Sequence, residues 1–229
     1  MERETSNKLR FIIEELIPPI IRDSFIFTYI IKKIHRSDDL HFNLKEKIFT
    51  SKKNIYKTYY KIESKIHNQT DLSKKCISEI HKNIKGKKVI DVGCGNGYLL
   101  KTLSKMNLNL SASDVKIFPK NKNEFKRLQI KYREEQINNI NYKKNSFDTV
   151  ICTHVLEHIL EIEKAYKKLI AITKHTLIIV IPKERPYKHT FNGHIHFFPY
   201  HWCFINLIKP KNNYKIFEIN RDFIYIEHK

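Results

Sequence analysis

From residue 72 onward, short apolar runs alternate with amphipathic stretches. The runs at 88–92, 108–113, 149–153 and 176–181 have the length of buried strands. Between the last two, apolar residues recur at helical spacing: Ile162, Ala165, Tyr166, Leu169 and Ile170. Strands that alternate with helices predict an α/β fold, in which helices cover both faces of a parallel sheet.

The two ends of the chain depart from this alternation. Apolar runs at 214–219 and 223–227 are close enough to form a hairpin, which predicts one antiparallel strand at the end of the sheet. Residues 1–70 have a helical and irregular pattern, interrupted at Pro18-Pro19. We therefore expect an N-terminal helical extension or lid over residues 1–70 and one ligand-binding domain over residues 71–229, whose first helix is capped by Thr70 or Asp71.

Three of the five glycines directly follow the run at 88–92; they are Gly93, Gly95 and Gly97. Glycine lets the backbone turn tightly and lets a ligand lie against its amides. Asp91 falls at the end of the first strand, and Asp114 falls at the end of the second, about twenty residues beyond the glycines. A carboxylate in the second position can accept hydrogen bonds from both hydroxyls of a ribose, so the pattern predicts a nucleoside ligand.

A dinucleotide-binding loop would have a third glycine where Tyr98 stands. The run from Val89 to Gly97 resembles instead the first motif of the class I S-adenosylmethionine-dependent methyltransferases, and 145–152 and Val155-Leu156-Glu157-His158 follow the order and spacing of the same family. The resemblance implies a Rossmann-like, mostly parallel seven-stranded sheet and S-adenosylmethionine as cofactor. It implies these cofactor-binding residues: Asp91, Gly93, Cys94, Gly95, Gly97, Asp114, Gln136, Ile137 and Thr153.

Two of these positions have roles that the resemblance specifies. Asp91 would accept a hydrogen bond near the ammonium group of the ligand. Members of the family commonly have an acidic residue at the position of Gln136, where it accepts a bond from the adenine amino group. The amide oxygen of Gln136 can accept that bond without a charge.

The net charge of +19 suggests a nucleic-acid partner, since basic surfaces bind phosphate. The charge is spread along the whole chain, however, and lysines far outnumber arginines, as an A+T-rich coding sequence would produce. Sites that recognise phosphate specifically favour arginine, whose planar guanidinium can donate two hydrogen bonds to it. A nucleic acid is thus an alternative partner and not the favoured one.

The sequence predicts a cytoplasmic protein. The four cysteines, Cys76, Cys94, Cys152 and Cys203, are too widely spaced for a disulfide framework or a zinc knuckle. No signal peptide is visible, and the apolar segment from Phe11 to Ile31 is interrupted by charges and prolines, so we expect no transmembrane helix. That segment could cap a binding site, which we favour, or lie on a membrane surface. No pattern specifies an oligomeric state.

Histidines supply the candidate acceptor chemistry, since seven of the twelve fall between His154 and His201. Methyl transfer to a hydroxyl requires an aligned acceptor and the removal of a proton, which histidine can accept near neutral pH. His154 follows the fourth strand and His196 follows the fifth, so both should lie beyond the carboxyl ends of the sheet. We predict one of these two as the catalytic base.

A metal site is an alternative use of the same residues. His154, Glu157 and His158 have the spacing of one helix face, and His194 or His196 could complete a ligand set. This arrangement resembles the metal-binding Glu-x-x-Glu-His of ubiquinone-pathway O-methyltransferases and small-RNA terminal ribose methyltransferases, with His154 replacing the first glutamate. Imidazoles favour zinc, iron or manganese over magnesium. We assign no metal ligand from the sequence alone.

The favoured function is methyl transfer from S-adenosylmethionine, with oxygen of a small-molecule, glycan or lipid-linked compound as the acceptor and residues 1–85 roofing the acceptor site. One alternative is an RNA (ribose) or protein methyltransferase that uses the basic surface. The chain has no Asn-Pro-Pro-Tyr-like motif after the fourth strand, which disfavours base amino methylation. The other alternative is a non-catalytic nucleoside-binding partner, against which the intact glycines and aspartates argue.

Overall fold

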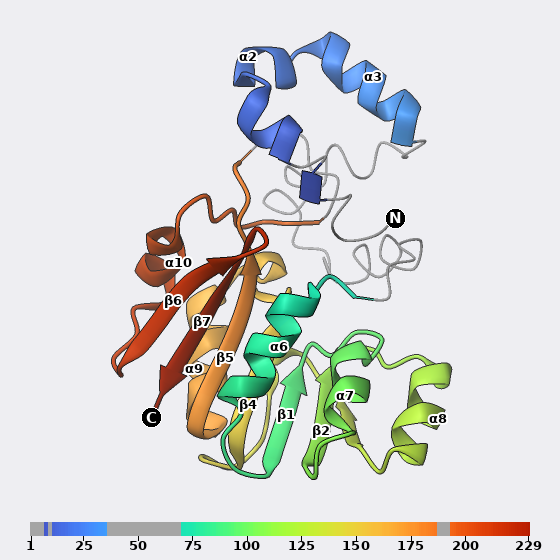
Figure 1. Cartoon of the computed structure of the whole chain (residues 1–229), viewed down its shortest axis with the longest axis vertical. Helices are drawn as coiled ribbons and strands as arrows, with labels where there is room; N and C mark the ends of the chain where they lie inside the picture. Colours follow the sequence, from blue (N-terminus) through green and yellow to red (C-terminus); the bar gives the residue numbers. More distant parts are fainter. Residues whose placement is uncertain (1–6, 9–10, 36–69, 187–192) are drawn as a thin grey trace.

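A seven-stranded sheet in the order β3-β2-β1-β4-β5-β7-β6 forms the centre of the molecule (Figure 1). The computed structural model describes residues 7–8, 11–35, 70–186 and 193–229. The first five strands run parallel, and β7 runs antiparallel to both of its neighbours. The strands are β1 (Lys88–Val92), β2 (Asn109–Asp114), β3 (Lys131–Glu134), β4 (Phe147–Thr153), β5 (Thr173–Pro182), β6 (Tyr214–Ile219) and β7 (Asp222–His228). The predicted Rossmann-like sheet with a C-terminal hairpin is confirmed.

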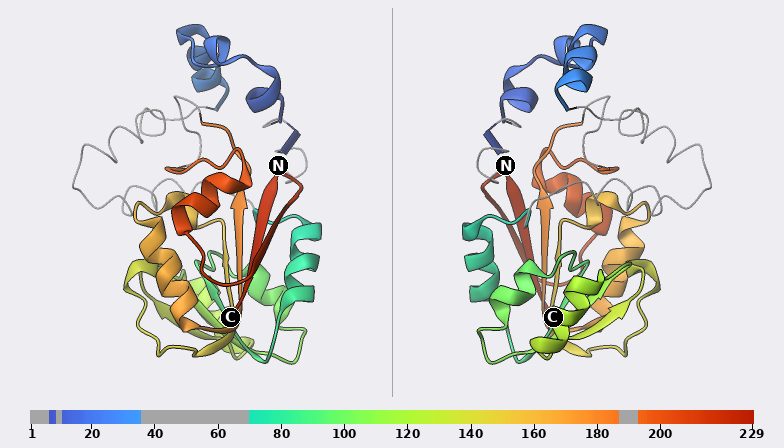
Figure 2. Two further views of the ribbon diagram at one scale, coloured as in Figure 1. Left: turned by 90° about the vertical axis from the view of Figure 1, so that its left-hand side faces the viewer. Right: turned by 90° about the vertical axis from the view of Figure 1, so that its right-hand side faces the viewer.

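Helices cover both faces of this sheet, as the two side views of Figure 2 show. One face packs around Leu100 and Phe125, and the other packs around Leu169 and Phe204. The helices of the first face are α6 (Lys74–Asn83), α7 (Tyr98–Leu103) and α8 (Pro119–Arg127), and those of the second are α9 (Ile162–Ile172) and α10 (His201–Ile208). Single 3-10 turns, η2 (Ile137–Asn139) and η3 (Leu156–His158), follow β3 and β4.

The first helix of the domain begins later than the sequence indicates. Ser73, and not Thr70 or Asp71, is the N-cap of α6, and its side chain accepts a hydrogen bond from the Cys76 amide at 3.2 Å. Thr70 instead accepts a bond from the amide of Leu72, which holds the turn before the helix. The prediction of the cap was wrong because several capping residues lie in succession and only Ser73 stands three residues before a free helical amide.

The N-terminal segment lies beyond the carboxyl end of β5 (Figure 1). It contains a π-helical turn, η1 (Ile12–Leu16), then α2 (Pro19–Arg22) and α3 (Phe25–His35), so the predicted break at Pro18-Pro19 is confirmed. No helix in the described ranges is long and apolar enough to cross a bilayer. Residues 36–69 lie outside the described residues, so the domain boundary at residue 70 stays a prediction.

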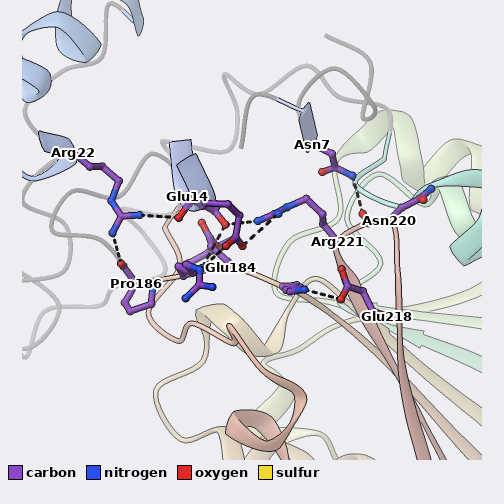
Figure 3. A network of polar contacts seen from close by, with 12 residues as sticks. Asn7, Glu14, Arg22, Glu184, Pro186, Glu218, Asn220 and Arg221 are labelled. Carbon is purple, nitrogen blue, oxygen red and sulfur yellow. Dashed lines mark hydrogen bonds and ion pairs between the residues drawn. The ribbon is translucent and has the colours of Figure 1, made fainter. Parts of the chain in front are cut away.

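Ion pairs join this segment to the sheet domain (Figure 3). Glu14 is buried, and its Oε2 lies 2.6 Å from Nη2 of Arg221 in the β6–β7 turn. Glu15 Oε2 lies 2.8 Å from Nε of Arg185, in the segment after β5. Charge-assisted bonds of this length are strong when they are shielded from water, so these bonds hold η1 against the sheet domain.

Candidate active site

The glycine loop connects β1 to α7 and is held against the end of β2. The amides of Gly93 and Cys94 donate to the carbonyl of Ser113 at 2.7 and 3.2 Å. The amide of Gly95 donates to Oδ2 of Asp114 at 2.8 Å. The two acidic strand ends predicted from the sequence are therefore joined through the loop, at the edge where open α/β sheets bind ligands.

Each glycine of the loop has a positive φ: 78° at Gly93, 52° at Gly95 and 75° at Gly97. A Cβ at Gly93 would lie 2.1 Å from Cγ2 of Val155, and one at Gly97 would lie 2.4 Å from the ring of Phe125. A Cβ at Gly95 would meet nothing within 4 Å. Gly93 and Gly97 thus allow close packing below the loop, whereas Gly95 leaves open space in which a ligand could approach the backbone.

Asp91 is buried beneath the loop with 2% of its surface exposed. Within the described residues its Oδ1 has no hydrogen-bond partner. Burial, and then the charge of Asp114, raise the pKa of Asp91 to about 7. A buried carboxyl group without a partner lacks a donor, and a ligand with an ammonium group would supply one. The site therefore fits the amino-acid end of S-adenosylmethionine.

The other predicted cofactor residues surround the same strand ends. Asp114 is half-buried, and so are Gln136, which follows β3, and Thr153, which ends β4. Ile137 is buried with 6% of its surface exposed. The Gln136 side chain does not cap η2, so it is not used to hold its own turn. The placement is compatible with their predicted roles, which remain predictions. Cys94 is buried, and burial raises its pKa well above the ordinary value, so its thiol is inert at neutral pH.

A second group of polar side chains gathers around Glu157, whose side chain is fully buried. His154 Nδ1 lies 3.4 Å from Glu157 Oε1, and Nε2 of both His158 and His194 lies 3.9 Å from the same atom. The rings of His158 and His194 meet edge to face, with centroids 4.8 Å apart. We call these four residues the histidine cluster.

The charges in the histidine cluster are unequal. Burial by itself raises the pKa of Glu157, but the contact with His154 and the charges of the surrounding imidazoles outweigh it and hold the pKa below the usual range. Burial lowers the pKa of His158 to about 4. At neutral pH the cluster therefore contains an ionised carboxylate beside a neutral imidazole. These are the protonation states that bind a divalent metal ion or a cationic group.

His154 lies between two buried carboxylates. Its Nε2 is 3.6 Å from Oδ1 of Asp222, on the side opposite Glu157. Its φ of 53° lies in the left-handed region, and its amide donates to the carbonyl of Val180 at 2.9 Å. The predicted helix face is wrong in detail, because only residues 156–158 form a turn and His154 precedes it. His154 and Glu157, which were predicted to be neighbours, nevertheless lie in contact across this turn.

The conformation of the loop of residues 193–198 determines which of His194 and His196 reaches the histidine cluster. The amides of Ile195 and His196 both donate to the carbonyl of Glu157, at 2.8 and 3.0 Å. His194 enters the cluster, whereas the ring of His196 donates from Nε2 to the carbonyl of Ile159 at 2.8 Å. His194 therefore completes the set, and only Nδ1 of His196 is left to accept a proton. The role of His154 or His196 as a base stays a prediction.

Two acidic residues of this site were missed in the sequence. Glu184, 1% exposed, forms a short hydrogen bond through Oε2 with Nδ1 of His194. Asp222 pairs with Pro182 across β7 and β5, which places it beside His154. The acidic residue two positions after β5 was a usable signal for Glu184. Asp222 resembled an ordinary turn residue of the hairpin, and nothing in the sequence distinguished it.

Glu157, His158 and His194 could hold a metal ion. One ligand atom from each lies within 4.8 Å of the others. Neither carboxylate oxygen of Glu157 has a hydrogen-bond partner among the residues described. A buried carboxylate with imidazole nitrogens 3.4–3.9 Å from its Oε1 fits a borderline divalent cation such as Zn²⁺ better than Mg²⁺. The bond from Glu184 would fix the tautomer of His194 so that Nε2 faces the cation.

The glycine loop and the histidine cluster meet at Val155. This residue lies between His154 and the turn that bears Glu157, and its side chain is the one that a Cβ on Gly93 would strike. A ligand above Gly95 and an acceptor beside Glu157 would consequently be neighbours. The arrangement can place a donor nucleoside and a polar acceptor at the same edge of the sheet.

Comparisons with known proteins agree with this arrangement. Residues 90–181 match the family model described as a methyltransferase domain. A SAM dependent methyltransferase from Aquifex aeolicus has a TM-score of 0.58 at 19% identity, over 74% of this chain and 97% of that one. The 1,6-didemethyltoxoflavin-N1-methyltransferase of Burkholderia thailandensis, solved with S-adenosylhomocysteine, also has a TM-score of 0.58, at 10% identity over 76% of this chain and 84% of its own. At such identities the likeness establishes the fold.

Curated relatives align over a shorter region. The ubiquinone biosynthesis O-methyltransferase of Coxiella burnetii is 32% identical over 96 residues, which are 40% of this chain and 41% of that protein. The enzyme of the same name from Acinetobacter baylyi is 26% identical over 133 residues, or 52% of this chain and 54% of its own. The match therefore spans about half of these relatives or less.

Proposed function

We propose that the chain is a class I S-adenosylmethionine-dependent methyltransferase that transfers a methyl group to an oxygen atom of a small-molecule, glycan or lipid-linked acceptor, and the match of residues 90–181 to the methyltransferase-domain model supports this. The observation that carries the proposal is the buried Asp91 carboxyl group, whose Oδ1 has no partner among the described residues beneath an open glycine loop. The ammonium group of S-adenosylmethionine would supply the donor that this oxygen lacks.

The donor half of the reaction relies on positioning. Asp91 would bind the ammonium group of the cofactor, and Asp114 would accept hydrogen bonds from the ribose. The backbone of Gly95 would lie against the methionine part of the cofactor. When bound, S-adenosylmethionine supplies a methyl group already activated by the sulfonium. The protein then has only to align an acceptor behind that methyl group and to exclude water.

The acceptor half supplies the proton chemistry. His154, between Glu157 and Asp222, would take the proton of the acceptor hydroxyl, because carboxylates on both sides stabilise the resulting imidazolium. A divalent metal ion on Glu157, His158 and His194 would polarise the same hydroxyl and lower its pKa. Either use favours an acceptor with an acidic hydroxyl, such as a phenol or a catechol, over an amine that is cationic at neutral pH.

The relatives support oxygen as the acceptor atom. The Coxiella and Acinetobacter proteins are both named as O-methyltransferases of ubiquinone biosynthesis. Because these alignments omit about half of each chain, the acceptor of this protein is proposed from the site and not taken from the names.

Radiolabelled S-adenosylmethionine gives the direct test. The protein is incubated with four acceptor classes: catechols with and without a prenyl tail, monosaccharides, total RNA, and a protein extract. We expect label in the catechol fraction and release of S-adenosylhomocysteine. Label confined to RNA or protein would replace the proposal by the corresponding alternative, and cofactor binding without label in any class would favour a non-catalytic nucleoside-binding protein.

Calorimetry tests the donor site separately. Asp114→Ala removes the proposed ribose acceptor, and affinity for S-adenosylmethionine should fall roughly 10–100-fold, the loss of about two charge-assisted hydrogen bonds. Asp23→Ala, which removes a half-exposed carboxylate from the N-terminal segment, is the matched control and should retain the affinity. Equal affinities of the wild type and Asp114→Ala would overturn the assignment of the donor site.

A further inference from the structure

The N-terminal segment exposes an unusual amount of apolar surface. The largest exposed fractions are 84% at Ile20, 83% at Phe25 and 71% at Ile26. We use the name N-terminal apolar surface for the exposed apolar residues from the end of η1 through α3, which are Leu16, Ile20, Ile21, Phe25, Ile26, Tyr29 and Ile30. Isolated apolar residues are common on protein surfaces, but a contiguous group of this kind marks a contact with a partner or a membrane.

The sequence of α3 makes this exposure more informative. Its eleven residues, FIFTYIIKKIH, are apolar almost throughout until Lys32 and Lys33. A helix of this composition is normally buried, either in a core or in lipid. Here Phe25, Ile26, Tyr29 and Ile30 repeat at the spacing of one helix face and remain exposed. The apolar face of α3 is thus directed away from the domain.

A pair of aromatic residues lies beside the segment. Tyr200 and Trp202 stack with ring centroids 5.5 Å apart, and about half of each side chain is exposed. The guanidinium of Arg185 lies 5.8 Å from the ring of Tyr200, and the same group pairs with Glu15. Tyrosine and tryptophan of this kind are enriched where proteins meet the headgroup region of a bilayer.

The segment is held in place by the contacts of Figure 3. Arg22 is 7% exposed, and its Nη2 donates to the carbonyl of Pro186 at 3.1 Å, while Glu14 pairs with Arg221. The charged side chains of η1 and α2 therefore face the domain and the apolar ones face outward. This is the polarity of a helix that lies in a membrane interface.

Charge decides between the occupants of this surface. The chain has a net charge of +19, and the exposed Lys33 follows Tyr29 and Ile30 at the spacing of the same helix face. A second copy would bring the same charge and repel the first, whereas anionic lipid headgroups attract it. Aliphatic isoleucines cannot stack on bases, so a nucleic acid does not account for them. Only an anionic bilayer surface satisfies both the apolar and the basic features.

We propose that the N-terminal apolar surface, with Tyr200 and Trp202 at its edge, docks the protein on the surface of an anionic phospholipid membrane. The contact is peripheral, since α2 and α3 are too short to cross a bilayer. Membrane docking stands without the proposed methyl transfer. Its purpose rests on that function: a lipid-linked acceptor would pass from the headgroup region to the histidine cluster.

Vesicle flotation tests the contact. The full chain is mixed with vesicles of phosphatidylcholine alone or of phosphatidylcholine containing about 30% of the anionic lipid phosphatidylglycerol. Trp202 is the only tryptophan, so its emission reports directly on the proposed edge. We expect binding to the anionic vesicles, a blue shift of the emission and quenching by brominated acyl chains. Binding that leaves the emission unchanged would overturn the proposal.

Three exposed residues are then replaced together: Ile20→Gln, Phe25→Gln and Ile26→Gln. Glutamine retains helix propensity and keeps the net charge, so vesicle binding should fall at least roughly 10-fold through the apolar contribution alone. The matched control replaces two exposed aromatic residues elsewhere, Phe118→Gln and Tyr214→Gln, and should bind as the wild type does. Equal binding by the triple variant would show that charge alone drives the contact and would overturn the proposal.

Two further measurements separate this proposal from its competitors. Light scattering at increasing protein concentration should show the same oligomeric state for the wild type and the triple variant. Self-association of the wild type that the triple variant loses would identify a second copy as the occupant. Calorimetry should give the triple variant the wild-type affinity for S-adenosylmethionine. Loss of vesicle binding with intact cofactor affinity is the signature of a membrane contact, whereas failure of cofactor binding in the wild type would count against the proposed function only.

Discussion

The glycine loop and the histidine cluster serve the two sides of one proposed reaction, yet they are built in opposite ways. The loop is local in the sequence: it uses backbone amides, three glycines and two strand-end aspartates between residues 91 and 114. The cluster brings together side chains that follow β4 and one from the loop before α10, and Glu184 after β5 and Asp222 at the start of β7 lie against it. A common cofactor can be recognised by backbone geometry, whereas an acceptor must be recognised by side chains that differ from one protein to another.

The two sites also differ in how their buried charges are compensated. Asp91 lies in a site where burial and a neighbouring carboxylate disfavour its ionised form, so its charge awaits a ligand. Glu157 is buried just as deeply but has three imidazoles around it. The first carboxylate is therefore poised to bind a cation from outside, and the second is already part of an internal network.

Replacing Glu157 should have the largest effect. Glu157→Gln keeps the shape of the side chain but removes the charge that organises His154, His158 and His194, so turnover of the acceptor found by labelling should fall roughly 10²–10⁴-fold. The affinity for S-adenosylmethionine should stay within about twofold, because the glycine loop is untouched. Glu161→Gln, at an exposed carboxylate close by, is the control. Unchanged turnover in Glu157→Gln would remove the cluster from the reaction.

The contact between the two sites can be broken at Gly93. A Cβ there would overlap Val155 at 2.1 Å and would require a positive φ, so Gly93→Ala should lower the free energy of unfolding by roughly 2–4 kcal/mol. Gly95→Ala has a positive φ but open space, and should lose only about 1 kcal/mol. Denaturant unfolding of both variants measures the difference. Equal losses would mean that Val155 moves aside freely and that the two sites are not packed together.

Two aspartates of the sheet should show opposite phenotypes. Asp91→Asn should weaken S-adenosylmethionine binding roughly 10–100-fold, since a charge-assisted bond to the ammonium group is lost, while leaving the protein at least as stable. Asp148 lies at the other end of the sheet, and hydrogen bonds from the Lys88 and Lys87 amides lower its pKa. Asp148→Asn should cost about 1–2 kcal/mol of stability and retain the affinity. Calorimetry and unfolding of both variants test the pair, and a reversed pattern would exchange their roles.

The same contrast explains what could be predicted from the sequence. The strands, the hairpin and the glycine loop depend on periodicity and on contiguous residues, and these were predicted correctly. His154, Glu157 and His158 could be grouped because they are close in the chain, although the helix that was expected to align them is a single turn. Nothing in the sequence selects His194 over His196 or brings in Asp222, because those choices depend on how separate loops pack in three dimensions. The N-cap at Ser73 was not predicted because several residues that can cap a helix lie next to one another.

The pH dependence of cofactor affinity is the smallest expected effect and the most specific. The pKa of Asp91 is raised in the folded protein, so its protonation stabilises the unliganded fold; this contribution is complete below about pH 4 and is lost as the pH rises through about 7. An ammonium group requires the ionised form, so binding of S-adenosylmethionine must release a proton below pH 7. Affinity should therefore rise about tenfold between pH 5.5 and 6.5.

Calorimetry in two buffers of different ionisation enthalpy would detect the released proton directly. Asp91→Asn has no proton to release, so its affinity should be weak and flat over the same range. Glu157→Gln should follow the wild-type slope, since the pKa of Glu157 is lowered and the group is ionised throughout this interval. A flat wild-type profile would mean that Asp91 is already ionised without ligand, and the difference in charge compensation between the two sites would disappear.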